Sequence, residues 1–191
     1  MSLTTFEIRW FVRERPVEVS EVFEQEPGER TDWYAPPGNG STGTKVREGR
    51  LETKLMTGAF GLLSRGNTVG VVQQWEKWAA VLEGGLPSET QLRDAGWIAV
   101  RKRRWMQVWS TEHAPPQLTM GRAGRGTLFE VTELRAEGQT WWTIGFESFG
   151  PEDSREASLH TVMDHLLDRF AGTLILSAAD SRSYPEWLLS L

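Results

Sequence analysis

Polar and apolar residues alternate along several short segments of the chain. In residues 5–12, Thr5, Glu7 and Arg9 alternate with apolar neighbours, which is the two-residue period of a strand with one polar and one apolar face. Glu137-Gly138 separates two such segments and predicts a hairpin. The same reasoning predicts strands at 32–34, 97–109, 127–134 and 140–148, and a last one at 173–177.

The segment 45–54 predicts a β-hairpin with Glu48-Gly49 as its two-residue turn. In that register Arg47 lies opposite Arg50, and Lys45 lies opposite Glu52. One face then carries Lys45, Arg47, Arg50, Glu52 and Lys54. Like charges directly opposite each other are destabilising unless something lies between them. The hairpin is therefore either a solvated basic face or part of an anion site, and the segment alone does not decide which.

Apolar residues at helical spacing predict helices at 17–25, 69–82 and 153–170. A further short helix is predicted at 89–95, because Ser88 is a good N-cap and Gly96 ends it. Residues 56–68 mix apolar residues with glycine and predict a turn or an irregular segment.

The size and composition indicate one globular domain spanning residues 1–191. The chain has no cysteine, which excludes disulfides, thiolate metal sites and cysteine nucleophiles. It shows neither an apolar run long enough for a membrane span nor a secretory signal pattern. A cytoplasmic protein with no membrane partner is the expectation.

The formal net charge of −5 argues against general affinity for nucleic acid, which needs a basic surface. A local basic cluster within an acidic chain has a different meaning, since it indicates a confined site for a small polyanion.

Several predicted strands share one pattern, in which one face carries charges of both signs and the other is aromatic or aliphatic. In a sandwich the polar faces would point to solvent. In a closed barrel they would line a polar lumen, with helices covering the apolar outer faces. The pattern alone permits both architectures.

The order of motifs resembles the CYTH superfamily, also called the triphosphate tunnel metalloenzymes, over nearly the whole chain. Thr5-Phe6-Glu7-Ile8-Arg9 is similar to the opening Glu-x-Glu-x-Lys strand of the family, with Thr5 and Arg9 as departures. Segments 129–133 and 145–147 resemble two acidic strands that come late in the family's sequences. In the second segment, Gly145 replaces an acidic residue. The hairpin 45–54, the segment 92–104 and the closing Ser183-Tyr184 with Leu188-Leu189 also look like family segments.

This resemblance implies an α+β fold built on an eight-stranded antiparallel barrel whose tunnel binds a triphosphate or polyphosphate. It implies hydrolysis of inorganic triphosphate or a triphosphate monoester with Mg²⁺ or Mn²⁺. The implied catalytic residues are Glu7 and Arg9. The implied metal ligands are Glu7, Glu52, Glu130 and Glu147, and the alternation of side chains along a strand disfavours Glu133. The implied substrate-binding cations are Lys45, Arg47, Arg50, Lys54, Lys102 and Arg104.

These residue types suit that chemistry. A triphosphate needs many compensating cations when it leaves water, and hydrolysis needs a hard divalent ion held by carboxylate oxygens. Two alternatives stay open, the first of them because Thr5 removes one possible metal ligand. One is a non-catalytic barrel that binds a polyanion or nucleotide with a partly lost metal site. The other is a barrel that carries an apolar ligand or partner on a surface rich in tryptophan.

Overall fold

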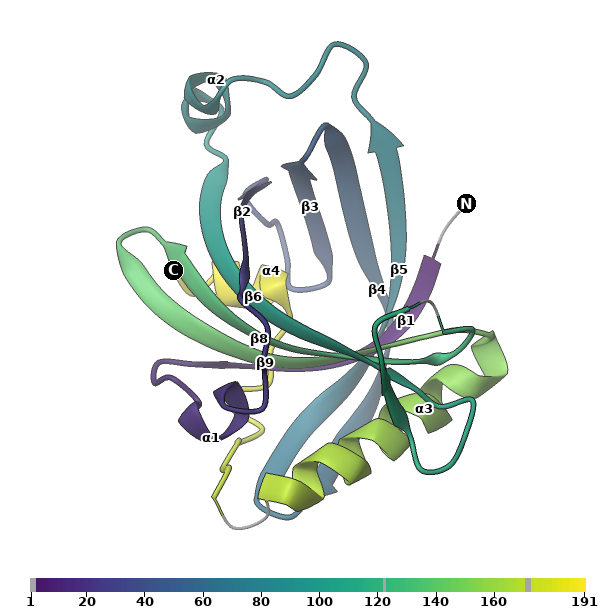
Figure 1. The fold of residues 1–191 in the computed structure, drawn as a ribbon. Coiled ribbons are helices and arrows are strands. Elements are labelled where there is room, and N and C mark those ends of the chain that lie inside the picture. The colour runs from purple at the N-terminus through teal and green to yellow at the C-terminus, as the bar shows by residue number, and fades with distance from the viewer. Residues whose placement is uncertain (1–2, 122, 171–172) are drawn as a thin grey trace.

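The fold is an antiparallel β-barrel of eight strands with helices at its periphery (Figure 1). It is described by a computed structural model that covers residues 3–121, 123–170 and 173–191. The fold class expected from the sequence is confirmed. The strands are β1 Leu3–Val12, β2 Gly28–Tyr34, β3 Thr42–Arg47, β4 Arg50–Arg65, β5 Thr68–Val81, β6 Ile98–Ser110, β7 Gln117–Thr119, β8 Gly126–Ala136 and β9 Gln139–Phe149.

The sheet closes on itself because β2 pairs with β3 on one side and with β6 on the other. The order around the ring is β2-β3-β4-β5-β1-β9-β8-β6, and β7 extends the sheet beyond β6 outside the ring. The seam between β2 and β3 is short. It consists of two residue pairs, Trp33 with Val46 and Tyr34 with Lys45.

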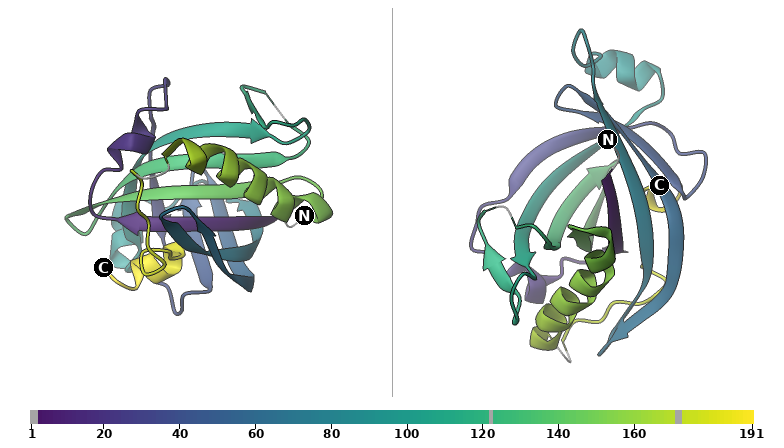
Figure 2. Two further views of the ribbon diagram at one scale, coloured as in Figure 1. Left: turned by 90° about the horizontal axis from the view of Figure 1, so that it is seen from below. Right: turned by 90° about the vertical axis from the view of Figure 1, so that its right-hand side faces the viewer.

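Four helices and a 3₁₀ turn accompany the strands: α1 Val17–Ser20, α2 Glu89–Asp94, α3 Glu152–Leu167, the turn Asp168–Phe170 and α4 Tyr184–Leu188. Helix α3 lies across the outer side of the barrel (Figure 2) and contacts β1, β8 and β9. Its Leu159, Val162 and Met163 are buried against Ile8 and Phe146 in the largest apolar core. Within the described residues, no helix is long and apolar enough to cross a membrane.

Strand β1 shows how the alternating pattern sorts side chains between the outer core and the lumen. Phe6, Ile8 and Trp10 belong to the core beneath α3, whereas Glu7 and Arg9 line the cavity inside the barrel. Polar inward faces and apolar outward faces therefore decide between the two architectures in favour of the barrel.

The C-terminal segment closes one end of the lumen. It follows β1, where the Phe11 amide donates to Asp180 O at 2.9 Å and the Arg182 amide donates to Arg9 O at 3.1 Å. Ser183 caps α4 in a reciprocal capping box with Glu186. Its hydroxyl also donates to Gly40 O at 2.8 Å. Trp187 is fully buried in a small core with Phe11 and Tyr34, so α4 forms a plug.

The helix predicted at 69–82 is wrong, because this segment forms β5. The apolar positions resembled helical spacing, but the segment is rich in valine and tryptophan, which favour strands. The irregular segment predicted at 56–68 is also wrong, because β4 continues to Arg65. Two register shifts, between Met56 and Gly58 and between Ala59 and Leu62, let this glycine-containing strand bend with the barrel.

Smaller predictions also differ from the structure. The helix predicted at 17–25 is confined to α1, with four residues. The strand predicted at 173–177 is wrong, because the described residues 173–177 contribute only an isolated bridge between Leu176 and Thr68. The hairpins around Glu48-Gly49 and Glu137-Gly138 are confirmed, and all four turn residues have positive φ.

Candidate functional site

The barrel contains a cavity of about 110 Å³ whose lining includes many charged side chains. A single water needs about 10–15 Å³ on this measure, so the space suits a small ligand rather than a macromolecule. Cations outnumber carboxylates in its wall. The cavity is lined by Arg9, Arg30, Lys45, Lys54, Lys102, Arg104 and Arg182 against Glu7, Glu52, Glu130 and Glu147.

The hairpin register predicted from the sequence is confirmed, with Arg47 opposite Arg50 and Lys45 opposite Glu52. Lys45 and Lys54 line the cavity. Arg47 reaches the cavity wall through Glu52, which accepts from its Nη2 at 2.9 Å. Arg50 lies beside the turn, is exposed, and is not among the cavity-lining residues.

A buried carboxylate, Asp32 of β2, holds several of these cations. Its Oδ2 lies 3.1 Å from Lys45 Nζ and 3.0 Å from Lys102 Nζ, and its Oδ1 lies 2.9 Å from Arg30 Nε. Asp32 is wholly buried. Burial raises the pKa of its carboxyl, but Lys102, Lys45 and Arg30 together bring that pKa well below its ordinary value.

The two lysines at Asp32 are hard to charge. Burial and the charge of Lys102 lower the pKa of Lys45 to about 7, although Asp32 opposes the shift. Burial lowers the pKa of Lys102 to about 8, again against the attraction of Asp32. The Lys102 ammonium also lies 4.0 Å from the centre of the Tyr184 ring, which places it at the plugged end of the lumen.

Glu52 of β4 anchors a second group of cations. Its carboxylate lies 2.9 Å from Arg47, 3.5 Å from Lys45 and 3.3 Å from Lys77. Burial raises the pKa of Glu52, but these cations outweigh burial and lower it to about 2. Glu52 therefore stays ionised across the physiological pH range.

Glu130 of β8 is held by two guanidinium groups. Its Oε1 accepts from Arg9 at 2.8 Å, and its Oε2 accepts from Arg104 Nε at 2.9 Å. Burial raises the pKa of Glu130, but the two arginines bring it well below its ordinary value. Both oxygens of this carboxylate are thus occupied by charge-assisted hydrogen bonds.

Glu7 and Glu147 lie opposite each other in β1 and β9. Lys54 bridges them, with its Nζ bonded to Glu7 and 3.4 Å from Glu147 Oε1. The Thr5 hydroxyl donates to Glu7 at 2.8 Å. Burial lowers the pKa of Lys54, but Glu147 and Glu7 reverse this effect and raise it.

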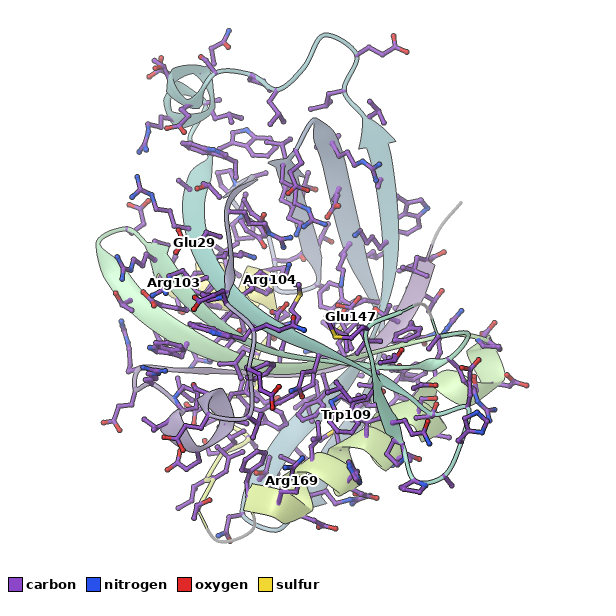
Figure 3. The ribbon with its side chains drawn as sticks, in the orientation of Figure 1. Glu29, Arg103, Arg104, Trp109, Glu147 and Arg169 are labelled. Atoms are coloured by element: carbon purple, nitrogen blue, oxygen red, sulfur yellow. The ribbon has the colours of Figure 1, made fainter. Side chains whose placement is uncertain are left out.

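The adjacent charges Arg103 and Arg104 of β6 lie on opposite strand faces, as the alternation predicts. Arg104 and Glu147 lie within the barrel, whereas Arg103 and Glu29 lie together on its outer side (Figure 3). Glu133 also faces outward, where it pairs with Arg103 and Arg135.

Sequence reasoning missed Arg30, Asp32, Arg182 and Tyr184 as participants in this site. Arg30 and Asp32 are two residues apart in β2, and this strand spacing was a usable signal. Tyr184 was placed only in a closing segment, yet its ring lies beside the cations of the lumen. Its place could not be predicted, because it depends on where α4 docks.

The divalent ion implied by the resemblance does not fit this arrangement of donors. Each of the four proposed ligands is bonded to a cation, and they fall into separate groups at Glu7 with Glu147, at Glu52 and at Glu130. Among the described residues, no three acidic or histidine side chains gather closely enough to hold a metal ion.

Comparisons with known proteins give a structural likeness alone. No family model matches the sequence, and no curated protein resembles it. A solved structure described as the PH1819 protein from Pyrococcus horikoshii OT3 is similar, with a TM-score of 0.43 and 13% sequence identity. The match covers 96% of this chain and 98% of that chain.

Proposed function

We propose that the barrel binds a small phosphate polyanion, such as inorganic triphosphate or a triphosphate monoester, within its lumen. The main support for this proposal is the positive charge of the cavity wall. Seven cations line the cavity, against four lining carboxylates and the underlying Asp32. That excess of two positive charges is confined within a chain of net charge −5.

The cations also suit this ligand chemically. Arginine offers a planar fork that matches phosphate oxygens, and lysine offers a compact point charge. Several of the lumen cations share a carboxylate with another cation, as Lys45 and Lys102 share Asp32. A multiply charged ligand can bind one of these cations while the other stays paired with the carboxylate. The contacts between ligand oxygens and cations offset the cost of removing the ligand from water.

The test is calorimetric titration of the protein with sodium tripolyphosphate, compared with sulfate. Arg104→Gln removes a lumen guanidinium, and Arg103→Gln is the matched control because the neighbouring side chain faces outward. We expect Arg104→Gln to weaken binding by about tenfold or more, the value of one lost charge-assisted hydrogen bond. Equal effects of the two substitutions, or no saturable binding by the unmodified protein, would contradict the proposal.

The resemblance also implies metal-dependent hydrolysis, but the donors disfavour it, because Lys54 is ion-paired to both facing carboxylates, Glu7 and Glu147. Phosphate release from tripolyphosphate, ATP and thiamine triphosphate, followed with Mg²⁺ and with Mn²⁺, separates binding from hydrolysis. Turnover that Glu7→Gln abolishes while anion binding persists would reinstate a metal site at Glu7. Tight binding without turnover would favour the non-catalytic alternative.

A further inference from the structure

Gly145 of β9 leaves a space that the side chain of Arg9 fills. The two residues lie opposite each other in β1 and β9. A β-carbon added at Gly145 would lie 2.7 Å from the guanidinium carbon of Arg9 and equally close to its Nη1. Real β-carbons essentially never come this close to another atom, so a side chain at position 145 requires the flexible guanidinium end of Arg9 to shift.

The guanidinium is fixed in this space from several directions. Its Nη1 donates to Glu130 Oε1 at 2.8 Å and to Thr143 Oγ1 at 3.2 Å. The ring of Tyr184 lies 5.2 Å from its central carbon. Only a tenth of the Arg9 side chain is exposed, and that part faces the cavity. Arg9 is therefore a permanent, oriented positive charge in the lumen wall.

This cation occupies the part of the wall where carboxylates would have to converge to hold a metal. Position 145 carries no carboxylate, and Arg9 and Arg104 occupy the oxygens of Glu130. Glu7 accepts from Thr5 and Lys54 instead. The local chemistry is that of an anion site whose cations are supplied entirely by side chains.

We infer that the lumen binds its polyanion without a divalent cation, and that Arg9, seated against Gly145, provides the fixed charge that a metal would otherwise supply. This inference rests on the proposed function, since it concerns how the same cavity holds the same class of ligand. It concerns binding alone and requires no chemical step.

Two titrations test this inference directly. Tripolyphosphate is titrated into metal-stripped protein in EDTA and, separately, in excess Mg²⁺. We expect saturable binding in EDTA and weaker apparent binding in Mg²⁺, because Mg²⁺ competes with the protein for the ligand. Binding that appears only with Mg²⁺ would overturn the inference and preserve the proposed function. Absence of binding under both conditions would contradict the proposed function itself.

The protein alone is then titrated with Mn²⁺, and free Mn²⁺ is followed by electron paramagnetic resonance. We expect no saturable binding site in the micromolar range. A stoichiometric micromolar site would show that the lumen carboxylates hold a metal after all, and it would overturn the inference irrespective of any activity.

Substitutions link the effect to the residue pair. Arg9→Gln removes the fixed charge, retains the glycine, and should weaken tripolyphosphate binding in EDTA by about tenfold, as expected for a lost charge-assisted contact. Gly145→Ala should shift the Arg9 guanidinium from its position and weaken binding by less than Arg9→Gln does. Gly28→Ala is the matched control, because a β-carbon at this strand glycine meets nothing within 4 Å. Wild-type affinity in a folded Arg9→Gln variant would overturn the inference.

Discussion

Lys45 and Lys102 direct their ammonium groups at the same oxygen of Asp32, from 3.1 and 3.0 Å. Two buried like charges thus depend on one carboxylate. Burial lowers the pKa of both lysines against the attraction of Asp32, and the low pKa values make the lumen sensitive to pH near neutrality.

Anion binding should be accompanied by proton uptake. The pKa of Lys45 is about 7 and that of Lys102 about 8 in the free protein, and a bound polyanion favours their charged forms. The part of the affinity that these two lysines supply should therefore fall as pH rises from 6 to 9. Titration with tripolyphosphate at pH 7.5, in buffers of different ionisation enthalpy, measures the uptake. Lys45→Gln should reduce the proton uptake. Because protons exchanged by the ligand are the same for both proteins, unchanged uptake in the variant would show that Lys45 does not take up a proton on binding.

Replacing Asp32 should destabilise the barrel strongly. Asp32→Asn leaves buried cations without their counter-charge, and breaking a buried pair in this way costs about 3 kcal/mol or more. Urea denaturation measures the loss in the free energy of unfolding. Glu29→Gln is the control, because Glu29 pairs with Arg103 at the exposed outer surface and should lose less than about 1 kcal/mol. Comparable losses in the two variants would contradict this account of Asp32.

The contribution of Glu52 to stability should depend on pH. Its folded pKa of about 2 lies below its ordinary value of 4.5, so the carboxylate stabilises the fold above about pH 4.5 and loses this contribution as pH falls toward 2. The difference in unfolding free energy between wild type and Glu52→Gln should therefore shrink from pH 6 to pH 3.5. A difference that is equal at both pH values would disagree with the ion-paired state of Glu52.

The cap of α4 should matter for ligand binding as well as for stability. Ser183→Ala removes a capping box and should cost about 1 kcal/mol, and it also removes the bond to Gly40 that holds the plug. Thermal denaturation and tripolyphosphate titration measure the two effects. Ser88→Ala removes the same kind of capping box from α2, which does not line the lumen. Ser88→Ala should therefore lower stability and leave the affinity for tripolyphosphate unchanged. Equal losses of affinity in both variants would contradict a role for the plug in binding.

Much of the site could be predicted from local pattern. The Glu48-Gly49 turn fixes the hairpin register, and register fixes which side chains share a face. The alternation in β6 likewise separates Lys102 and Arg104, which face inward, from Arg103, which faces outward. These inferences need only the two-residue period of a strand.

Other features depend on contacts between distant segments. The helical spacing of apolar residues in 69–82 was misleading, because β5 is partly covered on both faces and its burial does not follow a simple alternation. Glu130 carries the same charge whether it binds a metal or Arg9. The space at Gly145 that Arg9 fills favours the pairing with Arg9, and it can be recognised only when β1 and β9 lie side by side.

The short seam between β2 and β3 depends on a side-chain ion pair as well as on backbone pairing. Two residue pairs join β2 to β3, whereas seven pairs join β2 to β6. Lys45 belongs to this seam, and its ammonium crosses the seam to Asp32. Lys45 also lines the cavity, so a ligand that draws this ammonium away from Asp32 would weaken the closure of the barrel at its shortest pairing.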